Sequence, residues 1–290
     1  MKKFIAYVFM LVAIVVALAL VNDCIVALIA KRTESSSAYK MWRLYGGNDS
    51  DEIAILGSSR AQNCYVPSMI STNCFNYGIS GCGVKELTAH VVAMSKRHGR
   101  SPVIINIDPW GLFSRKMVGD YRLAPESGML SWADGMPGIR FHGTLRPMLN
   151  RWMNERTAAY SIVDNGAILF KEQRSAKEWE AINKREEAMS FRMESKIESD
   201  FCDAIRSLAP RKAIIVVCPC STRFMELFTG CKELDAFLSR LSEIDNVAVA
   251  NYLGSDDFSD SDFIDTKHLT LEGARKFSTK LARDVLVEDR

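Results

Sequence analysis

Two short stretches near opposite ends of the chain carry residue types that together could catalyse acyl transfer. In the first, Ser58 and Ser59 directly follow Gly57 and the apolar run 53–56. Four apolar residues predict a short buried strand, and Gly57 allows a sharp turn after it. A hydroxyl at that point lies at the carboxyl edge of a sheet, where open α/β sheets bind ligands. The position therefore suits a serine nucleophile, although a strand followed by an ordinary polar turn would have the same pattern.

The second stretch, Asp265-Thr266-Lys267-His268, supplies a base and a carboxylate. The chain has four histidines, and only His268 has a carboxylate three residues before it, in a loop ahead of a predicted helix. A serine nucleophile needs a base to take its proton, and the base needs an orienting carboxylate. Ser59, His268 and Asp265 are therefore a candidate catalytic triad. For the Asp–His pair taken alone, a solvated surface loop is the alternative.

Three blocks of sequence, in this order along the chain, resemble the pattern of the SGNH (GDSL-type) hydrolase superfamily. Gly57-Ser58-Ser59 resembles the first block, with Ser58 where the family has Asp. Asn76-Tyr77-Gly78-Ile79-Ser80-Gly81 resembles the second block, and Asp265-x-x-His268 resembles the last. The resemblance covers roughly residues 52 to 288, apart from a long middle insertion.

This resemblance implies a role for each matching residue. Ser59 would be the nucleophile, His268 its base and Asp265 the orienting carboxylate. The backbone N–H groups of Ser59 and Gly81 would receive the oxyanion.

The third family block, Gly-x-Asn-Asp, is not kept. Its place is taken by Ile104-Ile105-Asn106-Ile107-Asp108-Pro109-Trp110. Asn106 is a further candidate oxyanion donor, although the family places its Asn beyond the strand. Asp108, if ionised, can accept hydrogen bonds but cannot donate one.

An apolar N-terminal segment predicts a membrane anchor. The run Phe4 to Val21 has 18 apolar residues, about 27 Å of helix, against a bilayer core of ~30 Å. Lys2 and Lys3 before it favour a cytoplasmic N-terminus. We therefore predict a single-pass anchor with the catalytic domain outside the cytoplasm, periplasmic or on the cell surface. Cleavage after Ala17-Leu18-Ala19, or a soluble form of the protein, is the alternative.

The chain divides into an anchor and one large domain. We assign residues 1–30 to the anchor, 31–51 to a juxtamembrane linker and 52–290 to an SGNH-hydrolase-like domain with an insertion at about 110–194. Three aromatic residues of the linker, spaced by three, could lie at the membrane interface or pack on the domain: Tyr39, Trp42 and Tyr45. The insertion could select the substrate or simply cover the sheet.

The pattern of the large domain alternates strands with helices. Apolar runs near 53–56, 74–77, 103–108, 213–217 and 247–250 are separated by helical stripes, the last one beginning at Leu271. This alternation predicts an α/β fold: a parallel sheet of about five strands flanked by helices, a flavodoxin-like three-layer sandwich.

Composition narrows the function classes. A formal net charge of +2 argues against a nucleic-acid-binding domain, which usually has a strong basic excess. The sequence has neither a phosphate-binding loop nor a dinucleotide fingerprint, and Cys218-Pro-Cys220 is too tightly spaced for a zinc pair. We therefore expect no cofactor and no metal. The pairing of the eight cysteines cannot be read from the sequence.

The anchor, the Gly-Ser-Ser first block and the altered third block resemble membrane-anchored SGNH-like proteins of alginate O-acetylation and teichoic-acid D-alanylation. That likeness implies a serine esterase or O-acyltransferase that forms an acyl-serine intermediate on a cell-envelope polysaccharide. It also implies a multi-span acyltransferase as partner. Two alternatives stay open: a binding protein on a catalytically decayed hydrolase fold, and a plain lipase or esterase.

Overall fold

The computed structural model describes residues 2–45, 51–112, 161–171 and 174–286. Most of the predicted insertion at 110–194 therefore lies outside the described residues. The parts of it that are described include the antiparallel pair β5 (Ser161–Asp164) and β6 (Ala167–Phe170) and the helix α8 (Ala176–Arg185). The role predicted for this insertion stays a prediction.

Five parallel strands form the centre of the large domain. Their order across the sheet is β2-β1-β3-β8-β9, with every neighbouring pair parallel. The strands are β1 (Ile53–Leu56), β2 (Cys74–Asn76), β3 (Val103–Asn106), β8 (Ala213–Val217) and β9 (Val247–Asn251). The predicted α/β class with a five-stranded parallel sheet is confirmed. The β1 strand lies between β2 and β3, so its carboxyl end opens near the middle of the sheet edge.

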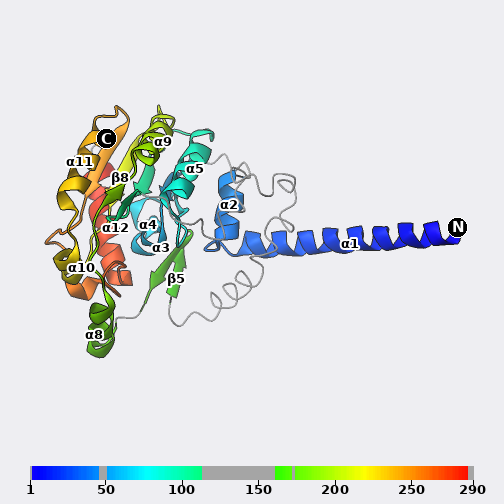
Figure 1. Ribbon diagram of the computed structural model, residues 1–290, viewed down its shortest axis with the longest axis horizontal. Coiled ribbons are helices and arrows are strands. Elements are labelled where there is room, and N and C mark those ends of the chain that lie inside the picture. Colours follow the sequence, from blue (N-terminus) through cyan, green and yellow to red (C-terminus); the bar gives the residue numbers. More distant parts are fainter. Residues whose placement is uncertain (1, 46–50, 113–160, 172–173, 287–290) are drawn as a thin grey trace.

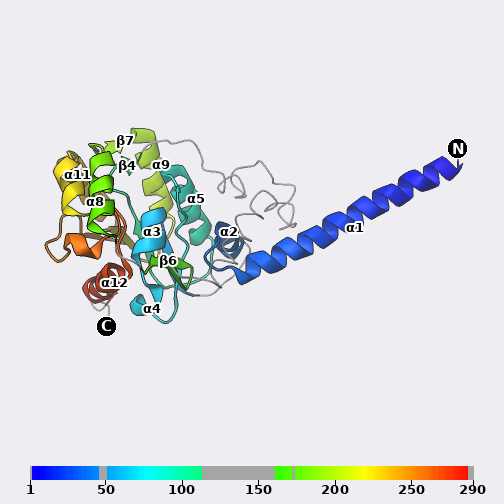
Figure 2. The ribbon, with the colours of Figure 1, turned by 90° about the horizontal axis from the view of Figure 1, so that it is seen from below.

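Helices cover both faces of this sheet (Figures 1 and 2). Because side chains alternate along a strand, Ala54 and Leu56 face one core while Ile55 faces the other. The first core is closed by α5 (Val84–Ser95), α9 (Ser195–Arg206) and α11 (Cys231–Ser242). The second is closed by α3 (Ser59–Cys64), α4 (Pro67–Ile70) and α12 (Leu271–Leu286).

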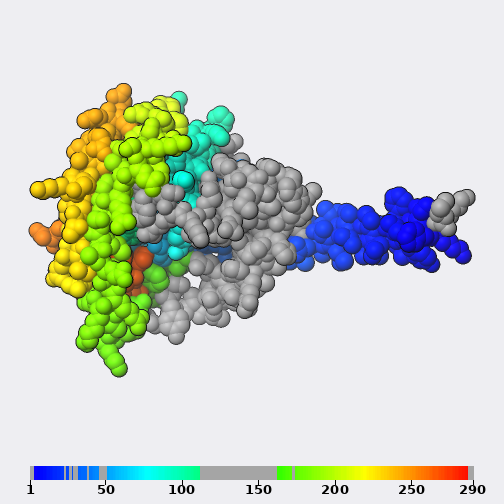
Figure 3. Space-filling model, in the orientation of Figure 1, coloured from blue at the N-terminus to red at the C-terminus, as the bar shows by residue number. Residues whose placement is uncertain are grey.

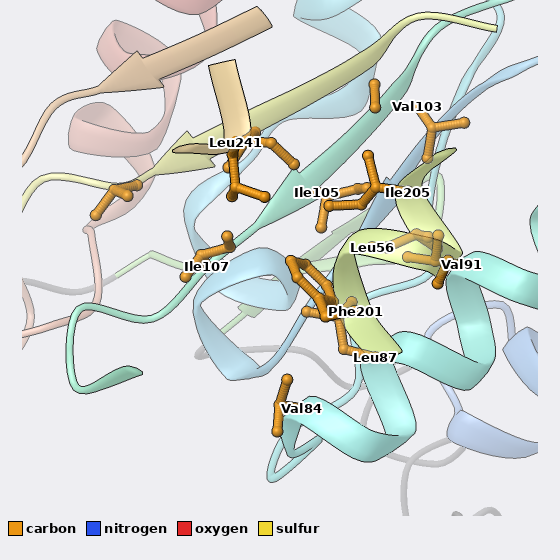
Figure 4. Close-up of a cluster of buried hydrophobic side chains, with 14 of the residues drawn as sticks. Leu56, Val84, Leu87, Val91, Val103, Ile105, Ile107, Phe201, Ile205 and Leu241 are labelled. Atoms are coloured by element: carbon orange, nitrogen blue, oxygen red, sulfur yellow. The ribbon is translucent and has the colours of Figure 1, made fainter. Parts of the chain in front are cut away.

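The packing of the first core explains why the strand sequences are continuous runs of apolar residues. In Figure 4, Leu56, Val103 and Ile105 from the sheet meet Leu87 of α5 and Phe201 of α9. A parallel sheet buried on both faces needs apolar residues at every position, not at alternate ones. The packing of these layers holds the carboxyl ends of β1 and β3 in fixed positions.

Short elements complete the described part of the chain. The strands β4 (Gly111–Leu112) and β7 (Arg192–Met193) pair in parallel. The helix α10 (Thr222–Leu227) and the short 3₁₀ helix η5 (Asp260–Asp262) flank the carboxyl edge. All eight cysteines are unpaired thiols.

The N-terminal segment forms one long helix, α1 (Lys2–Arg32). Its stretch Lys3–Asn22 is long and apolar enough to cross a membrane. Figures 1 and 3 show this part of α1 standing clear of the domain, and none of the span Lys3–Asn22 is buried by the rest of the chain. This arrangement is consistent with a single-pass anchor.

A second helix, α2 (Ser37–Tyr45), follows α1 and packs on the domain. Tyr39 is buried and its ring centroid lies 6.0 Å from that of Phe75. Trp42 and Tyr45 are partly buried against the same core. These aromatic residues could have lain at the membrane interface or packed on the domain, and the structure shows them packed on the domain. The part of the predicted linker at 46–50 lies outside the described residues.

Candidate active site

The turn after β1 brings Ser59 to the carboxyl edge of the sheet. Gly57 has φ +147°, a conformation that side-chain-bearing residues rarely adopt. A Cβ on Gly57 would lie 2.8 Å from the Cβ of Ala61 and 3.0 Å from that of Asn106. Only glycine therefore fits where the chain passes between α3 and β3. Ser58 then caps α3, and Ser59 is the first residue of that helix.

Ser59, His268 and Asp265 come together although the serine and the histidine are separated by most of the domain. The Nε2 atom of His268 lies 2.9 Å from Ser59 Oγ. The Nδ1 atom of the same ring lies 3.0 and 2.9 Å from the two carboxylate oxygens of Asp265. These contacts form one chain of hydrogen bonds, from carboxylate to imidazole to hydroxyl, among the three residues of the predicted triad.

The loop that carries the histidine is held by its own backbone. Asp265 Oδ1 accepts hydrogen bonds from the backbone N–H groups of Lys267 and His268, both at 2.8 Å. Phe263 and Leu269 pair as an antiparallel bridge that closes the loop. The carboxylate therefore orients both the loop and the imidazole.

Charge and burial in this pair shift both pKa values. Burial alone would lower the pKa of His268, but the hydrogen bond and the charge of Asp265 outweigh it and raise that pKa above its ordinary 6.5. Burial alone would raise the pKa of Asp265, yet hydrogen bonds from His268 and the loop backbone hold it below its usual range. Asp265 thus stays ionised and favours the imidazolium that forms when the base takes a proton.

The neighbouring hydroxyl is used differently. Ser58 Oγ donates to Asp108 Oδ1 at 2.9 Å and accepts the backbone N–H of Arg60 at 3.3 Å. Ser58 therefore caps the helix and binds Asp108, whereas the Ser59 hydroxyl meets the imidazole of His268. This geometry distinguishes the two serines, which the sequence pattern alone could not do.

The second predicted block forms a turn beside the serine. The backbone N–H of Cys82 donates to the carbonyl of Ile79 at 3.0 Å, and Gly81 has φ +80°. A positive φ at the third position of such a turn is typical of type II, which favours glycine there. Within the described part of the chain, the N–H of Gly81 has no hydrogen-bond acceptor. The N–H of Ser59 belongs to the first turn of a helix, where the helix offers no acceptor.

Asn106 lies on the floor of the site with its amide already engaged. Its Oδ1 accepts from Tyr65 at 3.0 Å and from the thiol of Cys218 at 2.8 Å. Its Nδ2 lies 3.4 Å from Asp108 Oδ1, a long contact that uses one of the two N–H donors of the amide. Asn106 therefore fixes the end of β3, and its predicted part in the oxyanion hole stays a prediction.

A small cavity opens in front of the serine. It has a volume of about 100 Å³ and is lined on its polar side by Ser59, Gly81, Asn106 and Asp108, and on its apolar side by Val84, Leu87 and Trp110. Because about 10–15 Å³ of such space is enough for one water molecule, the cavity has room for several heavy atoms. The described residues therefore enclose room for a small acyl group beside Ser59.

Arg60, next to Ser59, was not among the predicted site residues. It is fully buried, and its guanidinium donates to the carbonyls of Cys218 at 2.6 Å and Pro219 at 2.8 Å. Its charge also attracts Asp108 and so balances a carboxylate near the cavity. No local pattern reveals this role, because its hydrogen-bond partners lie about 160 positions along the chain.

Glu186, at the end of α8, is a second residue that the sequence did not single out. Its carboxylate accepts the Thr266 hydroxyl at 2.5 Å and pairs with the ammonium of Lys267 at 2.5 Å. Both partners lie between Asp265 and His268, so Glu186 supports the histidine loop from outside.

No groups of three or more potential metal ligands occur among the residues that the structure describes.

Comparison with known proteins adds little to this geometry. No family model and no curated protein matches the chain. A solved structure from Streptococcus pneumonia, provisionally described as a platelet activating factor, aligns with 92% of this chain and 99% of its own, at 11% identity and a TM-score of 0.43. A likeness of this size supports no conclusion about function.

Proposed function

We propose that this protein is a membrane-anchored serine acyl-ester hydrolase or O-acyltransferase of the SGNH type. The observation that carries the proposal is the hydrogen-bonded chain from Asp265 through His268 to Ser59 at the mouth of a small cavity. A serine is a weak nucleophile unless a base accepts its proton in the transition state. General-base assistance of this kind is worth about 10²–10⁴-fold in rate.

The proposed reaction has two steps. His268 Nε2 takes the proton of Ser59 while Oγ attacks the ester carbonyl, and the N–H groups of Ser59 and Gly81 hydrogen-bond to the oxyanion. When the tetrahedral intermediate collapses, the imidazolium gives its proton to the leaving alcohol, and the acyl group stays on Ser59. Water or a sugar hydroxyl then attacks this acyl-serine, with His268 again as base. The bond from the acyl carbon to Ser59 Oγ breaks, and the imidazolium returns its proton to Ser59, which gives hydrolysis or transfer.

The acyl group would be small, and the acceptor would lie close to a membrane. The cavity volume supports the first statement and the apolar helix α1 the second. We therefore propose an envelope polysaccharide as the acceptor or donor of the acyl group, with a multi-span acyltransferase as partner. Transfer requires a hydroxyl to be held over the acyl-serine while water is excluded, and such orientation can be worth ~7–11 kcal/mol.

The first experiment tests the nucleophile and base together. A fluorophosphonate probe should label the detergent-solubilised full chain at Ser59. Ser59→Ala should abolish labelling, Ser58→Ala should retain it, and His268→Ala should slow it by several orders of magnitude. With an activated acetyl ester, Ser59→Ala combined with His268→Ala should lose scarcely more turnover than either single variant, because the residues act as one unit.

Several outcomes would contradict this proposal. Labelling lost in Ser58→Ala but kept in Ser59→Ala would move the nucleophile by one residue. An unlabelled but folded wild-type protein would favour a binding protein on a decayed hydrolase fold. If free acetate is the sole product with every envelope glycan offered, and deleting the gene leaves polymer acylation unchanged, the protein is an esterase and not a transferase.

A further inference from the structure

The helix next to the anchor contacts the turn that carries Gly81. Lys40 of α2 is 1% exposed, and its ammonium donates a hydrogen bond of 2.5 Å to the carbonyl of Gly78. A buried ammonium is costly unless oxygen atoms replace its lost water. A methionine of similar length would fill the space without that desolvation cost. We therefore infer that the positive charge of Lys40 has a role beyond packing. One acceptor of the Lys40 ammonium is therefore a backbone carbonyl, that of Gly78, three residues before Gly81.

The peptide group between Gly78 and Ile79 joins α2 to the nucleophile turn. Its oxygen accepts from Lys40, and its N–H donates to the carbonyl of Gly57 at 3.0 Å. Gly57 is the residue that sets the turn before Ser59. A hydrogen bond to the carbonyl of a peptide polarises that peptide and strengthens the hydrogen bond that its N–H group donates. The Lys40 ammonium therefore strengthens the hydrogen bond from Ile79 N–H to the carbonyl of Gly57.

The same peptide begins the turn in which Gly81 lies. The carbonyl of Ile79 accepts the N–H of Cys82 at 3.0 Å, which closes that turn. Gly78 itself lies directly on α3, because a Cβ there would come within 2.6 Å of the backbone N of Gln62. A rotation of the 78–79 peptide would therefore move Gly81 relative to Ser59.

The helix α2 has a second, separate attachment one turn from Lys40. Arg43 pairs with the buried carboxylate of Glu52 at 2.5 Å, and its Nε donates to the Tyr77 hydroxyl at 3.1 Å. Its guanidinium also lies 4.3 Å from the centre of the Phe75 ring. Arg43 thus fixes α2 to the domain without touching the 78–79 peptide, and it supplies a matched control for Lys40.

We propose that Lys40 is a positioning residue for the oxyanion-binding turn and acts through the Gly78–Ile79 peptide. The proposal rests on the proposed function, in which Gly81 is an oxyanion donor. It makes the membrane-proximal helix part of the catalytic architecture. Lys40 itself does not touch the substrate.

The experiment compares Lys40→Met with Arg43→Met in the detergent-solubilised full chain. Both remove one buried or half-buried cation from the same helix, and their melting temperatures show how much each destabilises the fold. The first measurement is the fluorophosphonate inactivation rate per folded molecule. The second is amide hydrogen exchange of the segment 78–83.

We expect Lys40→Met to slow inactivation by at least ~10-fold, a part of the ~10²–10³-fold that follows loss of a whole oxyanion donor. Exchange at 78–83 should rise in this variant. Arg43→Met should leave the rate per folded molecule and the exchange of 78–83 close to wild type. Lys40→Arg, which keeps a cationic donor, should retain more of the rate than Lys40→Met. With the acetyl ester, the loss should fall on kcat and not on KM.

Equal rate losses in Lys40→Met and Arg43→Met would show that α2 merely needs to be docked, and would overturn the proposal. Unchanged exchange at 78–83 in Lys40→Met would overturn it as well. If the wild-type protein does not react with the probe, the proposed function fails, and hydrogen exchange alone then decides whether Lys40 orders the turn.

Discussion

At the scale of single residues, the proposed mechanism makes Asp265 set the pH range in which Ser59 reacts, because only a neutral His268 can accept the proton. The raised pKa of His268 means that labelling of Ser59 should increase with pH through a midpoint above 6.5. In Asp265→Asn the effect of burial remains while the carboxylate that opposes it is gone. The midpoint should therefore move to lower pH, and the plateau should fall by about 10⁴-fold, as it does when a serine protease loses this carboxylate.

The matched control for this pH experiment is Asp284→Asn. Asp284 also binds a ring hydroxyl and a lysine, Tyr252 at 3.1 Å and Lys280 at 3.4 Å, but it lies on α12 away from the serine. Its substitution should leave the midpoint unchanged. A midpoint that does not move in Asp265→Asn would show that Asp265 does not control the protonation of His268.

At the scale of elements, the turn between β1 and α3 depends on the absence of a side chain at Gly57. Gly57→Ala must adopt a disfavoured φ and must also push Ala61 or Asn106 aside. Strain and overpacking each cost about 1–3 kcal/mol, so we expect a loss of roughly 2–6 kcal/mol in the free energy of unfolding, measured by urea titration. Fluorophosphonate labelling of the folded fraction should also fall, because Ser59 follows this turn.

Gly254→Ala separates the two causes. Gly254 also has a positive φ, +71°, but its Cβ would meet only the flexible end of Met225 at 3.2 Å. Backbone strain alone should cost about 1–2 kcal/mol there. If Gly57→Ala were no more destabilising than Gly254→Ala and were labelled normally, the contacts of a Cβ at position 57 with Ala61 and Asn106 would not contribute to the loss of stability.

The elements that could be predicted are those whose signals are local. The strand before Gly57 and the Asp–x–x–His loop are each encoded within a few residues, so the serine and its base could be named. The hairpin of β5 and β6 was missed although Asn165-Gly166 between two apolar runs is a turn signal. Lys40, Arg60 and Glu186 could not have been predicted, because each acquires its role from a partner at least 38 positions away.

At the scale of the whole molecule, the exposed thiol of Cys231 reports which side of the membrane the domain occupies. Cys231 is exposed at the start of α11, and its thiol is unpaired. A membrane-impermeant maleimide should label it in intact spheroplasts if the domain lies outside the cytoplasm. Because the Cys24 thiol is exposed as well, the test uses a Cys24→Ser background, in which Cys231→Ser should remove that label and leave Ser59 reactive. Labelling of Cys231 only after lysis would refute the outward orientation.

The passage from α1 to α2 has a consequence for which substrates can be reached. Thr33, Ser35 and Ser36 are buried, and α2 begins at Ser37, so the domain does not hang on a free tether. With Lys3–Asn22 in a bilayer, the rest of α1 would rise about 15 Å at 1.5 Å per residue before the domain begins. The domain would then be held at a fixed height above the membrane and would not move on a flexible linker. Under the proposed function, Ser59 would then reach only acyl groups at that fixed height above the membrane, and a polymer chain would have to enter this layer to be modified.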